Sequence, residues 1–230
     1  MKIIIPDWPA PSHIKAFTST RSSEDDTPQL IEKDKNFLKE TLKLPGEPCW
    51  LKQVHGTDLL HLEKPLTNPV EADASTTQTP NVICSILTAD CLPLLICNKK
   101  GTLVAAVHAG WKGLAANIIE KTLKQLSDSP KNLLVWLGPA IGPDAFEIGE
   151  DVKTALCTQA EDESAFHALK KEGKYLCDLY QLARLRLNKL GVQSVFGGKF
   201  CTYTQNSLFY SYRRNKQTGR IINLIYMTSC

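Results

Sequence analysis

The sequence predicts a mixed α/β fold organised around a mixed β-sheet. It contains two hairpin-like pairs of strand patterns and one unit of strand, glycine turn and helix, which begins at residue 102. Hairpins connect antiparallel strands, whereas a strand followed by a helix usually leads to a parallel strand. Both kinds of unit in one chain therefore favour a mixed sheet over a purely parallel one.

Hydrophobic spacing and turn residues predict the elements of the N-terminal half. An exposed loop over residues 21–28 precedes a helix over 29–43, whose apolar residues recur at helical intervals. Three strands follow, separated by turns at 88–93 and 98–101. They are expected at residues 82–87, 94–97 and 102–107.

The second half adds helices, strands and a final hairpin. Residues 108–113 are predicted to form a glycine-containing turn that opens a helix running through Leu126. Asp178 is the expected N-cap of another helix, which Gly191 ends. A further strand is predicted over residues 133–137, followed by a loop rich in Gly and Pro over 138–143. The chain is expected to finish with a hairpin whose two strands cover 208–212 and 220–227.

Length and composition describe an ordinary globular chain. It has 230 residues, of which 43% are hydrophobic and 22% charged, with a net charge of +3. Disorder, collagen-like repeats and a disulfide miniprotein are excluded. There is no repeat, linker or apolar run long enough to span a membrane, and no dense basic surface. We expect a single domain over residues 1–230, with neither a membrane nor a nucleic acid as its partner.

The first residues and the cysteines indicate a cytoplasmic protein. Only three apolar residues precede Pro6, which is too short for the core of a signal peptide. The eight cysteines are spread along the chain without a compact disulfide framework. A reducing cytoplasm is the simplest interpretation of both observations.

Three residues form a candidate metal site. His55 lies beside a glycine, His108 ends a hydrophobic strand, and Cys91 lies in a turn at a strand end. Two imidazoles and one thiolate make a three-ligand set with an open position, as in catalytic zinc sites. Their spacing matches no short metal motif, and spacing alone leaves core packing as the commoner outcome. The same thiol and imidazoles also suit a nucleophilic Cys/His pair.

Anion-binding and acid/base groups are also present. A glycine turn that opens a helix exposes backbone N–H groups, and Lys112 lies in that first turn. Other arginines whose guanidinium groups could bind an anion are Arg21, Arg213 and Arg214. The ordinary alternative for each is a solvated position on the surface. Candidate acid/base carboxylates, with a capping or turn role as the structural alternative, are Asp73 and Asp90.

The motifs together resemble the YfiH/laccase-domain family. The resemblance extends from about Arg21 to the C-terminus, and its His-Ala-Gly-Trp and Ala-Asp-Cys elements are highly specific. The matching segments are Gln53–Gly56, Ala89–Pro93, Val107–Gly113, Leu137–Gly142, Ser211–Arg214 and Thr218–Arg220.

This resemblance implies a fold, a metal and an activity. The fold is a layered α/β/β/α sandwich with mixed sheets, related to a bacterial cytotoxic-necrotizing-factor-like cysteine hydrolase. The metal is zinc, held by His55, Cys91 and His108, with copper as the alternative. The activity is phosphorolysis of adenosine, inosine, guanosine and methylthioadenosine, together with adenosine deamination. We expect a small-molecule enzyme that is a monomer or weak homodimer.

The resemblance also suggests roles for single residues, with two departures from the family. Arg21, helped by Lys112, is expected to hold phosphate, and Asp90 or Asp73 to move the proton. Arg21 is followed by Ser-Ser-Glu-Asp-Asp where the family has a glycine loop, and Lys112 replaces the usual Arg. A lysine lacks the bidentate fork of arginine, so both departures affect the substrate side rather than the metal side.

Three other functions remain open at this stage. A zinc hydrolase or amidase that edits peptidoglycan precursors would use the same metal. A copper-dependent polyphenol oxidase is weakened because five histidines without a His-x-His pair cannot supply a multicopper cluster. A regulatory module with a structural metal would need a fourth protein ligand, and none has a matching motif.

Overall fold

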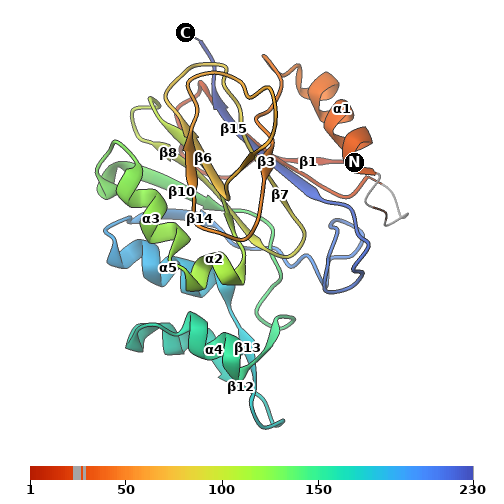
Figure 1. Ribbon diagram of the computed structural model, residues 1–230, viewed down its shortest axis with the longest axis vertical. Helices are drawn as coiled ribbons and strands as arrows, with labels where there is room; N and C mark the ends of the chain where they lie inside the picture. The colour runs from red at the N-terminus through yellow and green to blue at the C-terminus, as the bar shows by residue number, and fades with distance from the viewer. Residues whose placement is uncertain (23–26, 28–29, 230) are drawn as a thin grey trace.

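The computed structural model describes residues 1–22, 27 and 30–229, and it consists of four layers (Figure 1). A four-stranded antiparallel sheet packs face to face on a six-stranded mixed sheet, and helices cover the outer face of each. This arrangement confirms the expected α/β/β/α sandwich with a mixed sheet. Most of the loop predicted over 21–28 lies outside the described residues.

The first sheet has the order β1-β2-β15-β7, in which the C-terminal strand lies inside the sheet. Its strands are β1 (Ile3–Ile4), β2 (Ile14–Ser19), β7 (Cys84–Thr88) and β15 (Ile221–Met227). The outer face of this sheet packs on α1 (Leu30–Leu42), which confirms the first predicted helix. The C-terminal strand β15, seven residues long, therefore pairs on both sides with strands from the first half of the chain, β2 and β7.

The second sheet has the order β14-β10-β8-β9-β6-β4. The two end pairs, β14 with β10 and β4 with β6, are parallel, and the pairs between them are antiparallel. Its strands are β4 (Leu59–His61), β6 (Ala74–Thr77), β8 (Leu92–Asn98), β9 (Val104–Ala109), β10 (Leu133–Leu137) and β14 (Ser194–Gly197). All residues of β8, β9 and β10 are buried, as expected for strands covered on both faces.

Strand alternation separates two hydrophobic cores. In β8, Leu95 and Cys97 point between the sheets, where they meet Ile86 and Ile225 of the first sheet. The intervening residue Ile96 packs toward the helices on the other side. Because both faces of β8 are apolar, its position in the middle of the sandwich follows from its sequence.

Three helices cover the outer face of the second sheet. They are α2 (Trp111–Ala115), α3 (Ile118–Gln125) and α5 (Leu179–Lys189). The single helix expected through Leu126 is wrong, because Asn117 adopts the left-handed conformation with φ 65° and separates α2 from α3. None of the helices in the described part of the chain has the length and apolar character needed to cross a bilayer.

An arm projects from the lower end of the molecule (Figure 1). It contains a small antiparallel sheet, β11 (Glu147–Gly149), β12 (Phe166–Ala168) and β13 (Lys174–Cys177), and the helix α4 (Glu150–Leu156). Ile148 and Leu156 join the core beneath α2 and α5. A short parallel pair, β3 (Leu51–Lys52) with β5 (Val70–Glu71), and the 3-10 turns Pro130–Asn132 and Ala160–Ala165 complete the fold.

Two further local predictions need correction. The turn expected over 88–93 is shorter, because β8 already begins at Leu92 and Asp90 reverses the chain with φ 87°. The predicted C-terminal hairpin does not form, since residues 208–212 contain no strand and only β15 is extended. Phe209 and Tyr210 instead bury their rings in a small core with the first residue of β15.

The predicted capping of α5 is confirmed and can be tested. Asp178 Oδ1 accepts hydrogen bonds from the backbone N–H groups of Tyr180 and Gln181 at 2.9 and 3.0 Å. Asp178→Ala leaves both donors without this acceptor, so we expect a loss of about 1 kcal/mol in the free energy of unfolding. Urea titration measures it, with the exposed Asp144→Ala as a control of equal charge change. Equal stability of the two variants would contradict the capping role.

Candidate metal and substrate site

Two loops and the end of a strand bring His55, Cys91 and His108 together at one end of the second sheet. His55 lies between β3 and β4, Cys91 between β7 and β8, and His108 near the end of β9. Antiparallel pairing sets Pro93 opposite His108, which places the neighbouring turn beside the histidine. One ligand atom of each residue lies within 4.8 Å of the others, so these residues can hold a metal ion.

A buried carboxylate fixes two members of the cluster at once. Asp73 accepts hydrogen bonds from the backbone N–H groups of Val54, His55 and Gly56 at 3.1, 2.9 and 2.6 Å. Its Oδ1 also lies 2.7 Å from Nδ1 of His108. Burial of Asp73 raises the pKa of its carboxyl, but the hydrogen bonds from His108 and this loop outweigh burial and hold the pKa below its usual value.

This arrangement also prepares His108 for a metal. An Nδ1–H that donates to Asp73 leaves the lone pair of Nε2 for a metal, which is the usual carboxylate-histidine arrangement at zinc. In the metal-free protein, burial lowers the pKa of His108, but hydrogen bonds with Asp73 and Cys91 outweigh burial and raise the pKa to about 9. A bound metal therefore competes with a proton at this ring.

The thiol of Cys91 differs from the other buried thiols. Its Sγ lies 3.7 Å from Nε2 of His55. Burial raises the pKa of Cys91, but hydrogen bonds with His108 and His55 outweigh burial and lower the pKa to about 6. By contrast, burial alone raises the pKa of Cys97 to about 12. The cluster thus supplies a thiolate and two imidazoles, a donor set that fits zinc.

Backbone conformation and glycines make room for this packing. His55 has φ 61°, a strained conformation for a residue with a side chain, and its N–H bond to Asp73 stabilises it. A Cβ at Gly110 would lie 2.6 Å from Cδ2 of His55 and 3.1 Å from Sγ of Cys91. A Cβ at Gly113 would lie 3.0 Å from the carbonyl oxygen of Gly56. Close approach therefore accounts for both glycines of this turn.

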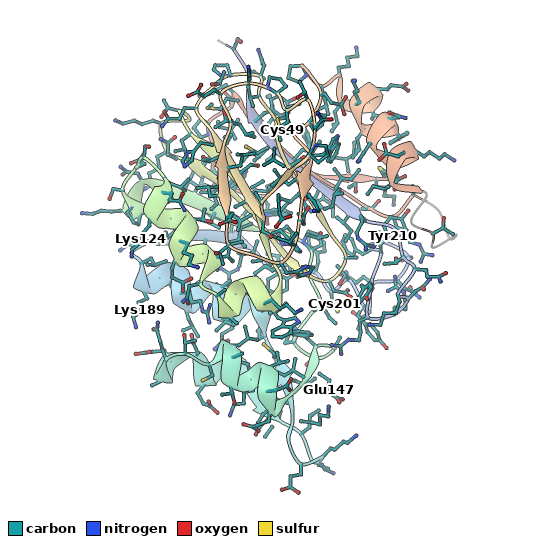
Figure 2. The ribbon with its side chains drawn as sticks, viewed as in Figure 1. Cys49, Lys124, Glu147, Lys189, Cys201 and Tyr210 are labelled. Atoms are coloured by element: carbon teal, nitrogen blue, oxygen red, sulfur yellow. The ribbon has the colours of Figure 1, made fainter. Side chains whose placement is uncertain are left out.

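Two cavities meet at the cluster. The larger, of about 510 Å³, is lined by Leu51, Gln53, His55, Leu87, Thr88, Ala89, Cys91, His108, Tyr212 and Arg220. The smaller, of about 260 Å³, is lined by His55, Ala89, Asp90, Cys91, Trp111, Ile141, Phe146, Leu179, Tyr212, Arg213 and Lys216. A third cavity, of about 650 Å³, lies beside Cys201, which is marked in Figure 2, and none of the three ligand residues lines it. The site chemistry therefore belongs to the first two.

Asp90 ties the C-terminal loop to the turn that carries Cys91. Its carboxylate accepts hydrogen bonds from the hydroxyls of Thr202 and Ser211 at 2.5 and 3.0 Å, and from the backbone N–H of Arg213 at 2.6 Å. The Arg213 side chain reaches the carbonyl oxygen of Glu147, which Figure 2 marks at the base of the arm. This loop therefore forms a wall of the smaller cavity.

The cations expected to bind phosphate lie elsewhere. Arg21 places its guanidinium over the ring of Tyr210 and donates to the carbonyl oxygen of Asn206 at 3.0 Å. Lys112 is exposed, with Nζ 5.8 Å from the ring centre of Trp111. The described lining of the two cavities at the cluster includes neither Arg21 nor Lys112.

Two other cations, for which the sequence analysis predicts no role, line the cavities. They are Arg220 in the larger cavity and Lys216 in the smaller one. Arg220 belongs to Thr218–Arg220, one of the segments that match the YfiH/laccase-domain family. This match is the only feature of the sequence that points to Arg220 as a site residue.

The chain is similar to known proteins along almost its whole length. Residues 14–228 match the family model described as multi-copper polyphenol oxidoreductase laccase. The chain is 46% identical over 242 residues to purine nucleoside phosphorylase YfiH of Escherichia coli (strain K12), covering 98% of this chain and 99% of that protein. It is 43% identical over 240 residues to a purine nucleoside phosphorylase of Pseudomonas aeruginosa, covering 97% and 98%. The chain belongs to the YfiH/laccase-domain family.

Solved structures of this family have the same fold. A Neisseria meningitidis protein assigned to DUF152 superposes with a TM-score of 0.92 at 38% identity, with all of both chains covered. A Bacillus licheniformis protein titled YfiH gives a TM-score of 0.84 at 22% identity, covering 94% of this chain and 93% of that one, and it bears on the fold alone. The relation to a toxin cysteine hydrolase fold, which these likenesses do not test, stays a prediction.

The close packing at Gly110 predicts a loss of metal on a small substitution. In Gly110→Ala, the new methyl group would lie 2.6 Å from Cδ2 of His55, so this ring must turn away from Cys91. We expect at least a tenfold loss of zinc affinity, the size of effect that disturbed ligand orientation usually causes. Competition with a chelator measures it, and Gly46→Ala provides the control, because its new methyl group makes only an ordinary contact, 3.9 Å from the carbonyl oxygen of Asn81. Unchanged zinc affinity in Gly110→Ala would be incompatible with this packing.

The environment of Cys91 predicts its titration in the metal-free protein. Its pKa of about 6 means that the thiolate predominates above pH 6 and is lost as the pH falls through that value. We expect the alkylation rate of Cys91, followed by peptide mass spectrometry, to show a midpoint near pH 6. A midpoint near the ordinary thiol pKa of 9 would show that the two imidazoles do not stabilise the thiolate.

Proposed function

We propose that this protein is a zinc-dependent purine nucleoside phosphorylase with adenosine, inosine, guanosine and methylthioadenosine as substrates, and that it also deaminates adenosine. The observation that carries the proposal is the cluster of His55, Cys91 and His108 at the junction of two cavities. Relatives that match nearly the whole chain at 46% and 43% identity are named purine nucleoside phosphorylases, which supports an enzyme of this type.

Zinc is the metal we propose for this cluster, with His55, Cys91 and His108 as its ligands. Thiolate and imidazole donors suit zinc, although copper(II) binds such donors more tightly when both metals are present. When bound, zinc would supply a Lewis acid for the departing base and would activate water for deamination. In the described part of the chain, His55, Cys91 and His108 are the only group with metal-ligand spacing, which argues against a multicopper oxidase.

The chain's own residues bind and orient the substrate. The smaller cavity presents the rings of Trp111, Phe146 and Tyr212, which suit stacking against a purine. Both cavities share His55, Cys91, Ala89 and Tyr212, so a nucleoside with its base in the smaller cavity has its sugar at the junction. This position brings the bond to be broken next to the metal ligands.

The two carboxylates act as positioning residues in this proposal. Asp73 is fully buried and holds His108 and the loop that carries His55. Asp90 has hydrogen bonds to both of its oxygens from the C-terminal loop. These contacts favour positioning over the proton transfer expected for them from the family resemblance.

We further propose that the protein works in the cytoplasm on small molecules, as a monomer or weak homodimer. Its seven described cysteines are all free thiols, which supports a reducing compartment. The two cavities at the cluster together have the size of a small-molecule site rather than of an extended polymer groove.

Removal of one ligand tests the proposal. Cys91→Ala should lose zinc and at least 100-fold of phosphorolysis together, because the site keeps only two ligands. Cys157→Ala is the matched control, because Cys157 is also half-buried and its thiol donates a hydrogen bond to Glu163, away from the cluster. This variant should keep its zinc and its phosphorolysis. Metal content and free purine from inosine, formed only with phosphate, are the measurements.

Three outcomes would contradict the proposal. Full activity of a zinc-free Cys91→Ala variant would exclude a catalytic metal there. A zinc-replete wild-type protein that releases no base from any of the four nucleosides would favour a different substrate, such as a peptidoglycan precursor. Activity that requires copper and oxidises phenols would favour the polyphenol oxidase.

A further inference from the structure

We propose that Arg220 binds the phosphate that attacks the nucleoside, so that phosphate occupies the larger cavity and the purine the smaller one. This inference rests on the proposed phosphorolysis and assigns its second substrate to a residue. It replaces Arg21 and Lys112 as phosphate ligands, because neither lines a cavity at the cluster.

Hydrogen bonds hold the side chain of Arg220 in place and leave some of its N–H donors for a ligand. Its Nη1 donates to the carbonyl oxygens of Thr218 and Gly219 at 2.7 and 2.9 Å. Within the described part of the chain, no carboxylate forms an ion pair with this guanidinium. Nε and Nη2 therefore remain for a bidentate contact, which an oxyanion such as phosphate suits well.

The lining of the larger cavity favours an anion. None of its described lining residues is acidic, whereas the smaller cavity contains Asp90. The Gln53 side chain is fully used, since Nε2 donates to the carbonyl oxygen of Leu87 and Oε1 accepts from the N–H of the same residue, at 2.8 and 2.7 Å. Thr88 accepts a hydrogen bond from Asn223 at 3.2 Å. Of the described residues that line this cavity, Arg220 is thus the one arginine or lysine.

The cations of the smaller cavity are already engaged. Arg213 donates to the carbonyl oxygen of Glu147 at 3.0 Å, and its guanidinium lies 5.4 Å from the ring centre of Phe146. Lys216 lies with Nζ 4.2 Å from the ring centre of Tyr212. These contacts place both cations next to aromatic rings. In this position they are better suited to contact the electron-rich face of a purine than to bind phosphate.

The two-cavity arrangement fits the balance of the reaction. A phosphate oxygen forms a bond to C1′ of the sugar while the bond between C1′ and N9 of the purine breaks, and the bonding electrons leave with the base, which takes up a proton. Phosphate and base must therefore lie on opposite sides of C1′. Two cavities that meet at His55, Cys91 and Tyr212 provide these two sides.

Arg220→Gln and Arg220→Lys test this assignment by steady-state kinetics on the zinc-loaded protein. We expect Arg220→Gln to raise the KM for phosphate roughly 10- to 100-fold, the usual effect of losing a charged hydrogen bond, with a much smaller change in the KM for inosine. Arg220→Lys should lie between Arg220→Gln and the wild type, because it keeps the charge but loses the fork. Lys124→Gln, on α3 and marked in Figure 2, is the surface control.

Arg21→Gln provides the competing measurement. A rise in the KM for phosphate in Arg21→Gln, with none in Arg220→Gln, would overturn the assignment. Equal rises in the KM for phosphate and inosine in Arg220→Gln would overturn it as well, because they would indicate a general disturbance of the site.

A titration with inorganic phosphate alone separates this inference from the proposed function. Calorimetry on the zinc-loaded wild type and on Arg220→Gln of equal zinc content needs no nucleoside and no turnover. Binding to the wild type that is weakened at least tenfold in Arg220→Gln supports the phosphate site, even if no nucleoside is cleaved. Equal binding in both proteins, or none in the wild type, would overturn it.

Discussion

The site depends on one buried carboxylate. Asp73 connects the loop before β4 to the end of β9 by accepting three backbone N–H groups and the Nδ1–H of His108. Hydrogen bonds to an ionised acceptor contribute about 1.5 to 3 kcal/mol each, enough to stabilise the strained backbone of His55. One side chain therefore sets the position of one ligand and the tautomer of another.

The scaffold around this carboxylate allows the ligands to crowd together. Two antiparallel strands place Cys91 beside His108, and glycines in the next turn leave the space that His55 and Cys91 occupy. The same crowding lowers the pKa of the Cys91 thiol, since two imidazoles outweigh the effect of burial. Packing, ionisation and metal affinity thus have a common origin in the close approach of these segments.

The matched family model is described as a laccase, whereas near full-length relatives are named phosphorylases. The donor set favours the second description, because one thiolate and two imidazoles form a single site and the other described histidines lie apart from it. His61 and His167 are exposed, and His13 lies 2.9 Å from the carbonyl oxygen of Gly101. A mononuclear site between two cavities suits group transfer between two substrates better than oxidation by several copper ions.

The sequence by itself determined most strands and helices, because apolar periodicity and the cap at Asp178 are local signals. It also singled out His55, Cys91 and His108, through motifs rather than spacing. Only the tertiary structure decided the break at Asn117, the missing hairpin near Phe209, and the positions of cations around the cavities. The last two features depend on contacts between distant segments, such as the hydrogen bonds of the C-terminal loop to Asp90, and no local pattern encodes them.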